Sequence, residues 1–207
     1  MNPVVLAALW IGWCAMHSIL IDTAFTSVVK ARLPGLVRYY RLLYNGLSLV
    51  TFLPLMGFTH RVGGTVIFGW EGWVGVSIRI LCLASAILLF WNGAKRYNFK
   101  SFLGINQLRA GETQVLLSTT QDFLPTGVFN ITRHPWYLGS LLSIWTIFSE
   151  YPRPLFVASF ILSVYLVVGT LLEERKIVNE YGHSYRRYQQ QVSMLFPWKW
   201  LINRLKW

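Results

Sequence analysis

Two short charged motifs near the C-terminal end combine residue types that can bind a ligand with one negative and one positive group. Thr132 to Gly139 reads T-R-H-P-W-Y-L-G, and Leu172 to Lys176 reads L-E-E-R-K. Arg133 offers forked N–H donors suited to a carboxylate, whereas Glu173 and Glu174 offer acceptors for an ammonium group. A pocket formed by both motifs would therefore bind a zwitterion, provided that the fold brings the motifs together.

The chain between the motifs is predicted to bring them together. Residues 136–149 and 154–172 are apolar, and the residues between them, Glu150-Tyr151-Pro152-Arg153, have the composition of a turn. Two antiparallel helices return the chain to the level at which it entered. We therefore expect the arginine of the first motif, together with His134, to stand beside the glutamate pair of the second motif at one membrane face.

Composition places the chain in a membrane. Its 207 residues are 54% apolar and 16% aromatic but only 13% charged, which is too apolar for an ordinary soluble domain. Residues 4–21 and 42–59 carry no charge, and residues 73–91 carry only Arg79, which snorkelling explains. Each stretch is long enough to cross a hydrocarbon core. With the hairpin, whose first helix should extend into its flanks, we predict an all-α, polytopic membrane helix bundle of about five transmembrane helices.

We expect a single integral-membrane domain over residues 1–207. Residues 1–92 would hold three spans, residues 93–132 a long cytoplasmic loop, and residues 133–207 the hairpin and a tail that complete the ligand site. In the tail, apolar side chains recur at helical spacing, which predicts a C-terminal amphipathic helix that Gly182 interrupts. This stripe consists of Ile177, Tyr181, Tyr185, Tyr188 and Val192.

The distribution of charge predicts an orientation. The formal net charge is +11, and most of the 19 Lys and Arg residues lie at 22–41, at 92–135 and after 172. This positive-inside pattern predicts an N-terminus outside and a C-terminus in the cytoplasm. The excess charge then favours contact with anionic membrane lipid, and we expect no nucleic-acid partner. Cysteine and histidine spacing indicates neither a disulfide framework nor a metal site.

The two motifs also allow structural interpretations. Pro135 is favoured at the first turn of a helix, so that Arg133 could simply reach lipid phosphate while His134 caps the helix. The glutamate pair opposes the helix dipole at the end of a span and needs a cation, which either Arg175 and Lys176 or a ligand could supply. A carboxylate with an ammonium group forms the amino-acid end of S-adenosylmethionine. Nearby aromatic rings could face its sulfonium by cation–π attraction, or could be ordinary interface residues.

Three stretches carry a family resemblance. They read G-V-F-N-I-T-R-H-P-W-Y-L-G, L-E-E-R-K-I-V-N-E-Y-G-H-S-Y-R-R-Y and V-S-M-L-F-P, within residues 125–197. This part resembles the integral-membrane methyltransferases of the isoprenylcysteine carboxyl methyltransferase and phospholipid methyltransferase superfamily. Phe129 stands where the family often has Tyr, and Ser193 stands where Pro is usual. The resemblance implies an S-adenosylmethionine site formed by Gly127, Arg133, His134, Pro135, Tyr137, Glu173 and Glu174.

The first half of the chain narrows the resemblance. M-H-S-I-L-I-D-T-A-F at 16–25, R-L-L-Y-N-G-L-S at 41–48 and F-L-G-I-N-Q-L at 102–108 are similar to the branch containing bacterial methanethiol S-methyltransferases. The denitrification-linked NnrU membrane family shares part of this pattern. The resemblance implies a location in a bacterial inner membrane. The expected function is methyl transfer from S-adenosylmethionine, at the cytoplasmic face, to a small thiol or to an isoprenylcysteine or lipid group. The alternative is a non-catalytic, NnrU-like membrane protein that supports a redox or haem pathway.

Two polar residues in the predicted spans are candidates for catalysis. His17 and Asn45 fall near the cytoplasmic ends of the first and second spans, and polar groups at that depth are functional suspects. His17 would be a base for a thiol, whereas a carboxylate acceptor would need none. A histidine hydrogen-bonded between two helices is the structural alternative. A membrane reductase is a weaker possibility, since no Gly-rich phosphate-binding motif is present.

Overall fold

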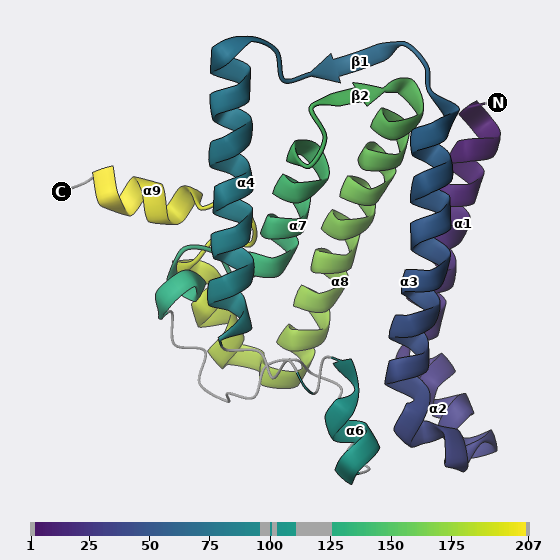
Figure 1. Ribbon diagram of the computed structural model, residues 1–207. Helices are drawn as coiled ribbons and strands as arrows, with labels where there is room; N and C mark the ends of the chain where they lie inside the picture. The colour runs from purple at the N-terminus through teal and green to yellow at the C-terminus, as the bar shows by residue number, and fades with distance from the viewer. Residues whose placement is uncertain (1–2, 96–99, 101–102, 111–125, 206–207) are drawn as a thin grey trace. The chain divides into compact units, whose positions relative to one another are not determined.

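The computed structural model describes residues 3–95, 100, 103–110 and 126–205, which fold mainly into helices (Figure 1). Four helices are long and apolar enough to cross a membrane: α1 Pro3–Ile21, α3 Val37–Val62, α4 Gly72–Ala94 and α8 Arg153–Gln191. The shorter helices are α2 Thr23–Arg32, η1 Pro34–Leu36, α6 Ile105–Ala110, η2 Gly127–Asn130, α7 Pro135–Thr146 and α9 Trp198–Leu205. These elements confirm the predicted all-α fold and indicate an integral membrane protein.

The chain divides into two compact units. The first comprises residues 1–68, 97–118 and 151–162, and the second comprises residues 69–96, 119–150 and 163–207. The single domain over 1–207 therefore stays a prediction. About half of the predicted loop 93–132 lies outside the described residues. The part of this loop that is described includes the short helices α6 and η2.

In the first unit, side-chain hydrogen bonds join α1 to α3 across their apolar faces. The indole of Trp10, which is fully buried, donates to Thr59 Oγ1 over 3.0 Å, and the indole of Trp13 donates to Thr51 Oγ1 over 3.1 Å. Buried donors of this kind need partners where no water is available. The start of α2 is fixed by Asp22, whose carboxylate accepts from the backbone N of Ala24 over 2.8 Å.

In the second unit, α4 packs closely against α7 because two glycines remove side chains from the contact. A Cβ on Gly93 would lie 2.5 Å from the ring of Trp136, and a Cβ on Gly139 would lie 3.3 Å from the ring of Phe90. The Trp136 indole then donates to the Phe90 carbonyl over 3.3 Å. The glycines therefore set the distance between α4 and the start of α7.

Helix α7 is shorter than the predicted fourth span. It begins at Pro135, as expected, but its 12 residues extend over about 18 Å, which is less than the thickness of a hydrocarbon core. It does not extend into its flanks because Arg79 of α4 binds its C-terminal end. Arg79 Nε donates to the Thr146 carbonyl over 2.8 Å and Nη2 donates to the Ile147 carbonyl over 3.1 Å. Capping of a helix end, and not snorkelling, is therefore the role of this arginine.

The predicted turn at 150–153 is partly a strand. β2 Glu150–Pro152 pairs with β1 Val66–Gly69 in a two-stranded sheet, which was not predicted from the sequence. The predicted tail helix is present as the continuation of α8 to Gln191. Within α8, Gly182 has non-helical angles (φ 54°, ψ −122°), which confirms the predicted interruption. A positive φ of this size favours glycine.

Candidate functional site

The N-terminal end of α7 presents the first motif. Pro135 occupies the first helical turn, and His134 immediately precedes it. His134 occupies the N-cap position, as the structural alternative expected, but its side chain makes no capping hydrogen bond to α7. Its ring is almost fully buried and points instead toward α8, where Nε2 donates to Glu174 Oε1 over 2.7 Å. The chain fold of the second unit thus brings the two motifs together, as predicted.

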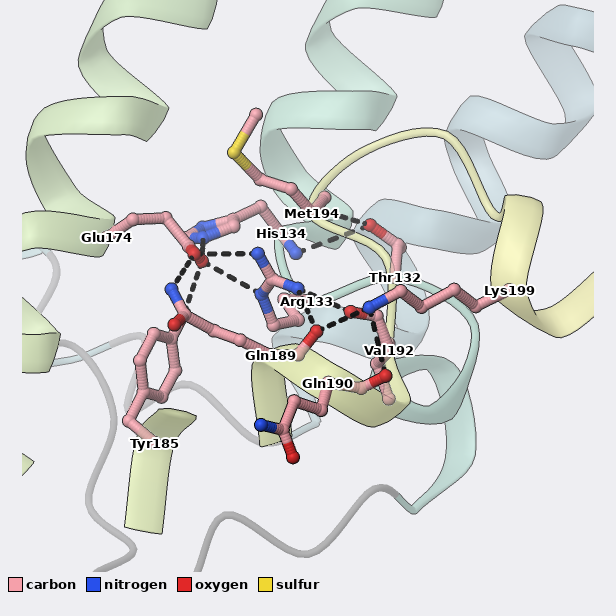
Figure 2. Close-up of polar contacts among 10 residues, drawn as sticks. All are labelled: Thr132, Arg133, His134, Glu174, Tyr185, Gln189, Gln190, Val192, Met194 and Lys199. Atoms are coloured by element: carbon pink, nitrogen blue, oxygen red, sulfur yellow. Dashed lines mark hydrogen bonds and ion pairs between the residues drawn. The ribbon is translucent and has the colours of Figure 1, made fainter. Parts of the chain in front are cut away.

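Arg133 binds the same carboxylate in a bidentate ion pair. Its Nε donates to Glu174 Oε1 over 3.0 Å, and its Nη2 donates to Glu174 Oε2 over 2.6 Å (Figure 2). Both side chains are buried, with relative exposures of 8% and 9%. The third nitrogen, Nη1, donates to the carbonyls of Gln189 and Val192. Among the described residues, four of the five N–H groups of the guanidinium therefore donate to acceptors of this chain.

Two further donors complete the surroundings of Glu174. The Tyr185 hydroxyl donates to Oε1, and Gln189 Nε2 donates to Oε2 over 2.6 Å. With Arg133 and His134, the carboxylate accepts from four side chains, which together replace its lost hydration. A carboxylate so completely bound has little capacity left for a ligand's ammonium group. In this structure Glu174 thus joins α7, α8 and the tail.

The break at Gly182 makes this arrangement possible. Tyr185 lies eleven residues after Glu174, so in a straight helix the two would be separated by about 16 Å along the axis. The chain reverses at Gly182, and the last part of α8 folds back toward the carboxylate. The apolar stripe of the tail becomes the core of this folded-back segment, with Tyr185, Tyr188 and Val192 buried. The predicted tail stripe is thereby confirmed.

Backbone hydrogen bonds hold the segment after α8 beside the first motif. Thr132 and Ser193 form a parallel β-bridge. The backbone N of Arg133 donates to the Ser193 carbonyl over 3.0 Å, and that of His134 donates to the Met194 carbonyl over 3.2 Å. The buried Thr132 hydroxyl also donates to Met194 O over 2.9 Å (Figure 2). Ser193 thus participates through its backbone, where the resembling family usually has Pro.

The other residues predicted for this site are more exposed. Glu173 is half-buried, and none of the described residues donates a hydrogen bond to its side chain. Tyr137 is half-buried, with its ring centre 5.6 Å from that of His134 in an edge-to-face arrangement. Gly127 begins η2 with a φ of 59° and has open space around it. These three residues, unlike Glu174, have surface available for a ligand.

The residues predicted to be catalytic lie in the first unit. His17 of α1 is placed between two hydroxyls of α3, with Nε2 2.6 Å from Tyr44 Oη and Nδ1 3.0 Å from Ser48 Oγ. Its ring also stacks on Trp13, with ring centres 5.1 Å apart. Because a neutral imidazole has one N–H and one free nitrogen, one hydroxyl donates to the ring and the other accepts from it. Asn45 is half-buried on α3, next to Tyr44.

Three residues that complete these clusters were not predicted from the sequence: Tyr44, Ser48 and Gln189. A fourth, Tyr185, was predicted only as part of the apolar stripe. The spacing of Tyr44 and Ser48 could have indicated their common role, since residues four positions apart lie on one face of a helix. Glu174 could also have been separated from Glu173, because it lies three residues before Ile177 and so continues the apolar stripe. For metal binding, no group of three His, Cys, Asp or Glu side chains is found among the described residues.

Comparison with known proteins gives a family. The profile of a family described as "Protein of unknown function (DUF1295)" matches residues 39–192, so the chain belongs to this family of membrane proteins. The matched part includes both charged motifs and most of α3. No solved structure matches the chain.

Several curated proteins with a stated activity are similar to the chain. It is 37% identical over 124 residues to a methanethiol S-methyltransferase of Pseudomonas deceptionensis, covering 56% of this chain and 47% of that protein. It is 36% identical over 87 residues to methanethiol S-methyltransferase 1 of Bradyrhizobium diazoefficiens (40% and 28%), and 30% identical over 122 residues to the Mycobacterium tuberculosis enzyme (53% and 47%). The chain thus spans less than half the length of these relatives.

Proposed function

We propose that this protein is a membrane methyltransferase that uses S-adenosylmethionine and methylates a small thiol of the methanethiol type. The observation that carries the proposal is the similarity to methanethiol S-methyltransferases of three bacteria, at 30 to 37% identity. The proposal places the site on the cytoplasmic side, with the N-terminus outside, on the basis of the distribution of Lys and Arg.

Two groups in the second unit support the proposal, because their chemistry suits part of this cofactor. Glu173 is the carboxylate available for an ammonium group, and the aromatic face of Tyr137 suits a sulfonium. Arg133, His134 and Glu174 are proposed to act by positioning, because their hydrogen bonds join the start of α7 to α8 and its folded-back end. When bound, the cofactor supplies a methyl group that is already activated by the sulfonium.

Methyl transfer then requires a thiolate, and it requires the thiolate sulfur to be aligned with the methyl carbon. The acceptor thiol loses its proton to a base, and its sulfur forms a bond to the methyl carbon as the carbon–sulfonium bond breaks. The products are a thioether, S-adenosylhomocysteine and a proton. His17 is the proposed base, with Tyr44 and Ser48 fixing its ring and its tautomer, and Asn45 is proposed to orient the acceptor.

The direct test measures product with the full chain in lipid nanodiscs. With methyl-labelled S-adenosylmethionine and methanethiol, labelled dimethyl sulfide should accumulate in the headspace. Parallel reactions offer a prenylcysteine analogue and the nanodisc lipids as acceptors. If the label is recovered only in the prenylcysteine analogue or only in the lipids, the acceptor is that group and not methanethiol. Absence of label from every fraction would contradict methyl transfer altogether.

Calorimetry separates binding from turnover. S-adenosylmethionine and S-adenosylhomocysteine should both bind the purified protein, and His17→Ala should abolish turnover while leaving binding intact. Loss of turnover and binding together would assign His17 the structural role of joining α1 to α3. Failure of the wild-type protein to bind either compound would favour the alternative, a non-catalytic NnrU-like protein that supports a redox or haem pathway.

A further inference from the structure

The last helix, α9, exposes its apolar side. Trp198, Ile202 and Leu205 are spaced at i, i+4 and i+7 and therefore share one helix face. Their relative exposures are 62%, 49% and 85%. Phe196, just before the helix, is 53% exposed and packs on Trp198 with ring centres 4.8 Å apart. A patch of this kind is unfavourable in water unless another apolar surface covers it.

One residue on the polar side of α9, Lys199, joins this helix to the end of α8. Lys199 Nζ donates to the carbonyls of Gln189 and Gln190 over 2.7 and 2.9 Å, and so caps the C-terminal end of α8 (Figure 2). The Lys199 backbone N also donates to Ser193 Oγ over 3.0 Å. Helix α9 thus exposes its apolar residues as well as Lys199, Asn203 and Arg204, whereas a surface helix of a soluble protein buries its apolar face.

The same unit contains a helix with the same kind of exposed surface. On α4, Leu81, Leu88 and Trp91 are 67%, 60% and 66% exposed, and α4 is one of the helices apolar enough to cross a membrane. Lipid is the medium that covers such residues. Helix α9 runs crosswise to α4, in the manner of a helix lying in the plane of a membrane (Figure 1).

We propose that α9 is a membrane-surface anchor, whose face of Trp198, Ile202 and Leu205 enters the acyl chains at the boundary of one leaflet. Asn203 and Arg204 lie on the other side of the helix, and the Arg204 guanidinium stacks over Trp200 at 5.3 Å, which leaves a cation at the headgroup level. The anchor holds the segment 193–194 and therefore the tail in place, through Lys199 and Ser193. This inference is independent of the proposed methyl transfer.

The test uses single-cysteine labelling of the full chain in phosphatidylcholine–phosphatidylglycerol vesicles. Cys14 and Cys82 are first replaced by Ala, and then either Leu205→Cys or Asn203→Cys is introduced and labelled with an environment-sensitive fluorophore. Both positions are exposed, so neither label should disturb folding. The label at 205 should show blue-shifted emission and be quenched by lipids carrying a spin label on the acyl chain, whereas the label at 203 should be quenched more by aqueous iodide.

Two outcomes would overturn the proposal. Equal quenching of both labels by iodide would mean that the apolar face lies in water. Protection of the label at 205 from both iodide and spin-labelled lipid would mean that protein, such as a second copy of the chain, covers the face.

Discussion

Replacement of Glu174 by Gln is the most informative perturbation of the site, because it removes a charge while keeping shape. The carboxylate accepts two hydrogen bonds from Arg133 and one each from His134, Tyr185 and Gln189. An amide has only one acceptor oxygen, and its NH2 group would face donors. In Glu174→Gln the buried guanidinium would therefore lose its counter-charge.

The magnitude follows from the burial of the pair. Both side chains are less than one tenth exposed, so that screening by solvent is small. Removal of one partner of a buried ion pair destabilises a protein by about 3–5 kcal/mol. For a chain of this size, a loss of that order corresponds to a decrease in Tm of about 6 to 20 °C.

The assay is thermal unfolding of purified protein in detergent, combined with limited trypsin digestion. Arg186 and Arg187 are exposed on the folded-back tail, and cleavage there should accelerate in Glu174→Gln because the tail loses its polar attachment. The matched control is Glu173→Gln, which removes the same charge one residue away. It should leave Tm within about 1 °C of the wild type and leave the digestion rate unchanged. A Tm for Glu174→Gln equal to that of the control would refute the claim that this carboxylate holds the tail.

Three other substitutions test the packing that positions the site. Gly93→Ala should destabilise the protein by about 1–3 kcal/mol, because its Cβ would collide with Trp136. Arg79→Leu should lower Tm, since each α7 carbonyl left without a donor costs about 1–3 kcal/mol. Thr59→Val should cost about 1–3 kcal/mol, because the buried Trp10 indole N–H would lose its acceptor. Thermal unfolding in the same detergent measures all three.

Each of these predictions has a control of opposite or intermediate effect. Gly46 lies within α3 with open space around it, so Gly46→Ala should stabilise the helix by up to about 1 kcal/mol. Destabilisation by both glycine substitutions would show that close packing is not the cause. Arg79→Lys keeps a charged donor and should fall between wild type and Arg79→Leu, whereas an equal loss would point to a role of the arginine other than capping. Thr59→Ser keeps the hydroxyl and should retain most of the stability; loss equal to that of Thr59→Val would argue against the hydrogen bond.

The main features of the fold could be predicted because membrane segments are encoded locally. The predicted spans at 4–21, 42–59 and 73–91 correspond to α1, α3 and α4, since length and the scarcity of charge determine them. The meeting of Arg133 and His134 with Glu174 also followed from simple geometry, because the two motifs flank one helical hairpin.

Other features depend on contacts between residues distant in sequence. The end of α7 is fixed by Arg79, which lies 67 residues earlier in the chain, and no local pattern encodes that partner. Likewise, Gly182 predicted an interruption but not its direction. Only the reversal of the chain brings Tyr185 and Gln189 to Glu174, so these two partners could not be predicted from local sequence.

The short α7 has a consequence for how the protein enters the membrane during synthesis. Arg79 lies about 10 Å along the axis of α4 from the first residue of that helix. The α7 carbonyls that Arg79 binds therefore lie within the hydrocarbon layer. Without that guanidinium, α7 would expose its last-turn carbonyls to lipid, at a cost of several kcal/mol for each group. Partitioning of α7 alone from the translocon is therefore unfavourable. We expect it to be released only beside α4, with the earlier helix acting as an insertion partner for the later one.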